Sequence, residues 1–112
     1  MPWPKVRITV LERTLFEDIC KEYGSKRFIE GGGCAPCGQF EDGQQFVLDH
    51  GLDKPDGFCS YAWADIRHEL MVVLNGGDRP YVRPEGTAIV CCTDAMKPVL
   101  FKIERIKEES RG

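Results

Sequence analysis

The chain has 112 residues and a formal net charge of −3, with 42% hydrophobic and 29% charged residues. This length predicts a single domain over residues 1–112 with one modest core, and the slight negative charge argues against nucleic acid as a main partner. The first residues, "MPWPKVRITV", lack a signal-peptide pattern, and no apolar run reaches the roughly 18 residues of a membrane span. We therefore expect a cytoplasmic protein with no membrane partner.

The first half of the chain predicts two strands and one helix. Residues 5–13 alternate between apolar and polar side chains, which is typical of a half-buried strand. A helix is predicted over residues 15–23, with Thr14 and Glu17 at the spacing of a capping box and a glycine at its end. Residues 25–38 contain four glycines and a proline, which predicts a loop, and a second strand follows over residues 44–49.

The second half predicts a long helix and a terminal hairpin. From Cys59 an apolar stripe continues at helical spacing through Trp63, Ile66, Leu70 and Val73, and the run Asn75-Gly76-Gly77 ends it. Strands are predicted over residues 87–93 and 98–106. The order predicts an α+β fold in which two helices pack against a mainly antiparallel sheet. A curled, barrel-like sheet is the alternative.

Six cysteines are many for a chain of this kind. In a reducing compartment, cysteines serve more often as ligands or redox thiols than as structural disulfides. Cys34 and Cys37 form a CxxC motif, whose spacing fits either one metal ion or a dithiol. No helical pattern follows the motif, so a thioredoxin-type site is disfavoured, and a loop that merely contains two thiols is the alternative.

The other four cysteines lie on predicted regular elements. Cys59 opens the long helix, where the helix dipole favours a thiolate, although a small buried side chain would also fit its place on the apolar stripe. Cys91 and Cys92 are adjacent on a strand and should point to opposite faces unless a bulge turns both towards one site. Cys20 lies off the apolar stripe of the first helix and is expected to be structural or incidental.

Three segments resemble a family of small prokaryotic proteins of about this length that is common in anaerobes. The segments are "KVRITVLER", "FCSYAWADI" and "IVCCTDAMKPVLFKIERI". The family has no settled activity. The resemblance implies functional positions at Cys37, which precedes "FEDGQQF", and at Cys59, Cys91 and Cys92. Cys34 is not a usual family position, and Ala95 stands where the family often has glycine.

Three functional hypotheses follow. The leading one is a protein that binds zinc or an iron–sulfur cluster through Cys37, Cys59, Cys91 and Cys92, acts in electron transfer or metal handling, and serves an unknown redox or metal-transfer partner. The second is a thiol–disulfide redox protein or sensor, in which Cys59 or one of the adjacent pair attacks and a Cys34–Cys37 bridge forms. The third is a homo-oligomeric interaction module with structural cysteines, whose interface would be marked by Trp3, Tyr61 and Tyr81.

Overall fold

A four-stranded antiparallel sheet organises the protein in a computed structural model that describes residues 3–49 and 51–106. The strands are β1 (Val6–Arg13), β2 (Gln45–Leu48), β3 (Thr87–Cys91) and β4 (Val99–Arg105). Their order in the sheet is β2-β1-β4-β3, and each neighbouring pair is antiparallel. The α+β prediction is confirmed, and the sheet is open rather than closed into a barrel.

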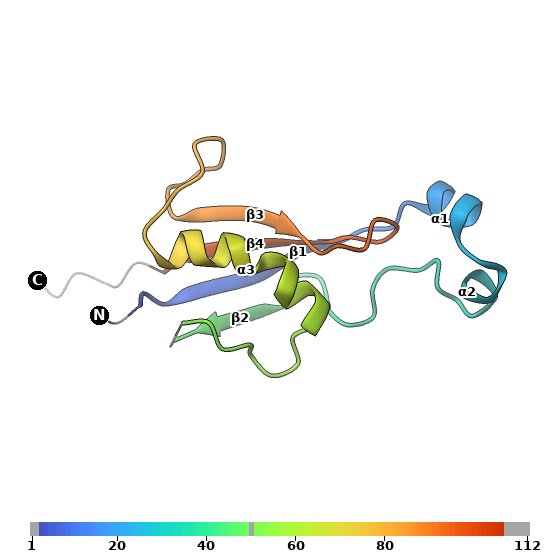
Figure 1. Cartoon of the computed structure of the whole chain (residues 1–112), viewed down its shortest axis with the longest axis horizontal. Coiled ribbons are helices and arrows are strands. Elements are labelled where there is room, and N and C mark those ends of the chain that lie inside the picture. The colour runs from blue at the N-terminus through green and yellow to red at the C-terminus, as the bar shows by residue number, and fades with distance from the viewer. Residues whose placement is uncertain (1–2, 50, 107–112) are drawn as a thin grey trace, which may run out of the picture.

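One face of the sheet is covered by α3 (Ser60–Leu74), which packs against β3 and β4 (Figure 1). Alternate side chains of each strand point towards this helix, as the period of two in the sequence predicts. The predicted helical stripe is buried as well, with Cys59 packed at its edge. The core is therefore made of the inward side chains Val6, Ile8, Val10, Val99, Phe101 and Ile103 together with Trp63, Ile66, Leu70 and Val73.

Aromatic rings fill the end of the core beside the first turn of α3. Phe58 lies 4.9 Å from Phe46, 5.0 Å from Phe40 and 5.5 Å from Trp63, between ring centroids, in edge-to-face arrangements. Phe40 meets Phe101 in the same geometry at 5.2 Å. Such pairs add about 0.5–1.5 kcal/mol each beyond the burial of their area. They attach the loop before β2 and the start of α3 to the sheet.

Two short helices, α1 (Glu17–Tyr23) and α2 (Lys26–Glu30), lie beyond the end of the sheet (Figure 1). The capping-box prediction is wrong, because the amide and hydroxyl of Thr14 both donate to the Pro98 carbonyl at 3.0 and 2.6 Å. Thr14 thus extends the pairing of β1 instead of capping α1.

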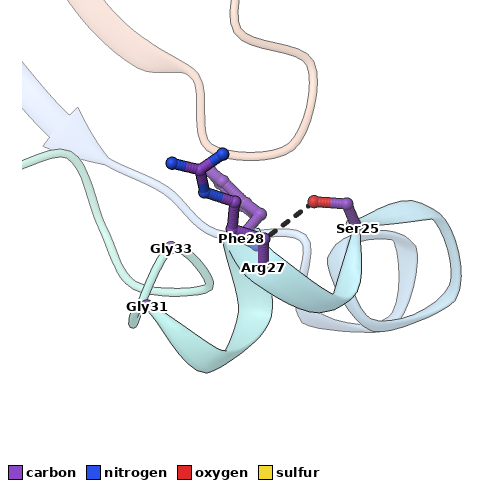
Figure 2. A pocket seen from close by; sticks show the side chains of 5 residues that line it. All are labelled: Ser25, Arg27, Phe28, Gly31 and Gly33. Carbon is purple, nitrogen blue, oxygen red and sulfur yellow. Dashed lines mark hydrogen bonds between the residues drawn. The ribbon is translucent and has the colours of Figure 1, made fainter.

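The loop prediction for residues 25–38 missed α2. Ser25 caps this helix by accepting a hydrogen bond from the Phe28 amide at 3.1 Å, drawn as a dashed line in Figure 2. A serine before a short run without glycine was the available signal, and the three glycines that follow obscured it.

Candidate functional site

Three of the four free cysteines line one pocket. Cys37 comes from the loop before β2, Cys59 from the start of α3, and Cys92 from the residue after β3. The pocket has a volume of about 370 Å³, and its wall is mainly apolar. We call it the thiol pocket, defined by the three cysteines with Phe40, Tyr61, Ala62, Thr93, Asp94, Lys97 and Val99.

The loop that carries Cys37 is fastened to the end of β1. The Arg13 guanidinium donates to the Cys37 carbonyl at 3.1 Å, and Asp42 accepts bonds from the Arg13 amide at 2.9 Å and from its Nε at 3.2 Å. The Arg13 amide and, next, its side chain lower the pKa of Asp42. The Gln39 amide points at the Cys37 sulfur, 3.4 Å away. The backbone around this thiol is therefore held by a charged pair.

Cys59 is the N-cap residue of α3, and its carbonyl accepts the Trp63 amide at 2.9 Å. Its side chain makes no capping hydrogen bond, so the sulfur is left to line the pocket. The preceding residue, Phe58, is buried in the aromatic cluster, and its carbonyl accepts a bond from Lys54. The position of the thiol follows from how α3 begins.

Cys92 and the turn after it close the other side of the pocket. The Val99 amide donates to the Cys92 sulfur at 3.3 Å, and the Cys92 amide donates to the Val99 carbonyl at 3.1 Å. Asp94 shapes this turn, because its carboxylate accepts hydrogen bonds from the amides of Met96 and Lys97. The end of β3 thereby directs one cysteine of the adjacent pair inwards.

Cys91 points the other way. It is exposed on the face of the sheet opposite α3, whereas Cys92 packs against the core, as the alternation along a strand predicts. No bulge in β3 turns the two thiols towards one site. Cys91 therefore does not join the thiol pocket.

The predicted metal-binding function is wrong. In residues 3–49 and 51–106, no group of three or more histidine, cysteine, aspartate or glutamate side chains lies close enough to hold a metal ion. A structural zinc or cluster site needs about four ligands at bonding distance, and thiols spread around a pocket do not meet that requirement. Of the four predicted ligands, Cys37, Cys59 and Cys92 share a pocket, and Cys91 lies on the opposite face of the sheet.

Cys20 and Cys34 form a disulfide between α1 and the loop after α2. This pairing corrects the expected Cys34–Cys37 bridge and leaves Cys37 as a free thiol three residues from a disulfide. Cys20 is structural, as predicted, and it is the one buried residue of α1, while α2 has none. The disulfide is accordingly the main cross-connection within this pair of helices.

Lys97 connects α2 and the loop after it to the thiol pocket. It lines the pocket, its ammonium group lies 3.4 Å from the Gly33 carbonyl, and it stands 5.4 Å from the centre of the Phe28 ring. Phe28 and Gly33 also line a separate hollow with Ser25, Arg27 and Gly31 (Figure 2), which contains no thiol. The sequence had no signal for Lys97, because the contact depends on how the β3–β4 turn meets α2.

No family model, curated protein or solved structure matches this chain. The family resemblance described above stays a prediction. In the part of the chain that the structure describes, no helix is long and apolar enough to cross a membrane.

Proposed function

We propose that this protein is a thiol–disulfide redox protein whose reactive thiols are Cys37, Cys59 and Cys92. The observation that supports this is their convergence: three thiols from three separate segments line one pocket. All three side chains also pack against the hydrophobic core, as small apolar side chains do. Residues that only fill space are expected inside the core, yet each of these is only partly buried.

The chemistry is exchange with a small disulfide. A pocket thiolate attacks one sulfur of the substrate, forms a mixed disulfide and releases the other substrate sulfur as a thiolate. A second pocket thiol, as its thiolate, then attacks the protein sulfur of the mixed disulfide and releases the second substrate thiolate. Overall, two protein thiols become one disulfide and one substrate disulfide becomes two thiols. The apolar wall and the ammonium group of Lys97 favour a substrate with apolar and anionic parts.

The test uses the folded protein with Cys91→Ser, because the exposed Cys91 would otherwise react first. The variant is incubated with oxidised glutathione, and intact mass and disulfide peptides are followed over time. We expect a transient glutathione adduct that resolves into a disulfide between two pocket cysteines, with a loss of two hydrogens.

A matched series then replaces one pocket cysteine at a time by serine in the same background. Replacement of the resolving cysteine should make the glutathione adduct persist. If the pocket thiols react only after denaturation, the proposal is refuted, and the cysteines are structural.

A further inference from the structure

The edge strand β3 leaves backbone hydrogen-bonding groups directed away from the sheet. The Arg105 amide donates to the Gly86 carbonyl, and the Cys92 amide donates to the Val99 carbonyl. Along an antiparallel strand, the backbone groups of successive residues point alternately towards one neighbour and the other. The amide and carbonyl groups of residues 86, 88, 90 and 92 therefore point towards β4. The amide and carbonyl groups of Ile89 and Cys91 therefore point outwards from the edge.

The outward-pointing side of β3 is covered at its two ends and uncovered at its centre. At one end, the Thr93 amide donates to the Asp65 carboxylate at 2.7 Å, and at the other, Thr87 is only 4% exposed. Within residues 3–49 and 51–106, the hydrogen bonds of the structure give the outward groups of Ile89 and Cys91 no partner. Ile89 is 43% exposed. The open part of the edge is thus short, apolar and unpaired.

Edge strands usually carry protection against pairing with another chain. Charged residues, proline, bulges or a covering loop are the common devices. The stretch "TAIVCCT", residues 87–93, has no charge or proline and no bulge. The opposite edge differs, because Val47 and Leu48 of β2 share a hollow with the following segment, which brings Asp49, Asp53 and Lys54 alongside.

We propose that β3 pairs with β3 of a second copy of this chain, antiparallel about a two-fold axis at Val90. This register places Ile89 opposite Cys91 of the other copy and pairs all the outward groups of both residues. A strand edge is complementary to itself in this way, because the same donors and acceptors meet after a two-fold rotation. The exposed Ile89 becomes covered, and the two Val90 side chains meet on the α3 side.

The proposed register predicts which cysteines can form a disulfide between the two copies. Cys91 faces Ile89 of the second copy and lies only diagonally from Cys91 of that copy, too far for a disulfide. The unmodified protein should therefore form no Cys91–Cys91 cross-link. The proposal is independent of thiol–disulfide exchange in the thiol pocket, since Cys91 lies outside that pocket.

The first experiment measures mass in solution as a function of protein concentration, by sedimentation under reducing conditions. The unmodified protein should be in a monomer–dimer equilibrium. Ile89→Lys should weaken dimerisation by about tenfold or more, because a charge at an edge opposes pairing. Val47→Lys is the matched control, since Val47 is 49% exposed on the other edge strand, and it should leave the equilibrium unchanged.

The second experiment tests the register by cross-linking. A hydrogen-bonded antiparallel pair has Cα atoms about 5.5 Å apart, within the range that a disulfide spans. Ile89→Cys should therefore give a covalent dimer under mild oxidation through Cys91, and adding Cys91→Ser should abolish it.

A monomer at every concentration, or equal effects of Ile89→Lys and Val47→Lys, would overturn the proposal. A cross-link that survives Cys91→Ser, or one formed by Cys91 in the unmodified protein, would overturn the proposed register.

Discussion

Removal of the Cys20–Cys34 disulfide should unfold α1 and α2 while leaving the sheet and α3 intact. The two helices contain seven and five residues, and helices this short do not persist in water without tertiary support. Cys20 is the only buried residue in either of them. The perturbation is Cys34→Ser, with Cys91→Ser as the control because Cys91 is exposed and free.

The size of the effect follows from the length of the closed loop. The disulfide joins residues 14 apart, and closing a loop of about 15 residues is worth about 3 kcal/mol of chain entropy. An opening equilibrium shifted by that amount changes by a factor of about 100 or more. Hydrogen exchange at the amides of α1 and α2 should accelerate accordingly, and a little under half of the helical circular dichroism should be lost, because α3 holds fifteen helical residues.

The midpoint of urea unfolding, followed by the fluorescence of the two tryptophans, Trp3 and Trp63, separates a local from a global effect. Trp63 lies in the core beside Phe58, far from the disulfide in the chain, so the midpoint should hardly move in Cys34→Ser. If exchange in α1 and α2 is unchanged, the disulfide does not organise these helices. If the midpoint falls by the amount that corresponds to a loss of about 3 kcal/mol in the free energy of unfolding, the helices belong to the same cooperative unit as the sheet.

Three further predictions concern the core and the supports of the site. Phe101→Ala removes a fully buried ring that contacts Phe40 and Phe58, and urea unfolding should show a loss of about 3–5 kcal/mol. Arg105→Ala removes bonds to the carbonyls of Val73 and Gly77, so exchange in the last turn of α3 should accelerate while its first turn is unaffected. Hydrogen bonds from Arg13, first from its amide and then from its side chain, lower the pKa of Asp42. Their stabilising effect is therefore present above the ordinary carboxyl pKa and is lost as pH falls through the lowered value, and Asp42→Asn should remove this step from the acid titration of stability.

Patterns carried by neighbouring residues determined much of the fold. The apolar stripe of α3, its end at Asn75 and the alternation of β1 and β4 are all visible in the sequence, because a helix or strand buries side chains at a fixed period. The same alternation separates Cys91 from Cys92. The sequence pattern did not predict α2, because three glycines follow this short helix and its serine cap.

Only the tertiary structure decided which cysteines meet. Spacing along the chain favoured a Cys34–Cys37 pair, whereas the position of α1 beside the later loop joins Cys34 to Cys20. The thiol pocket exists because the end of β3, the loop before β2 and the start of α3 meet at one end of the sheet, although β2 and β3 are its opposite edge strands. Residue types and spacing revealed that thiols were available, but distances between remote segments depend on how the sheet and helix pack, which no local pattern encodes.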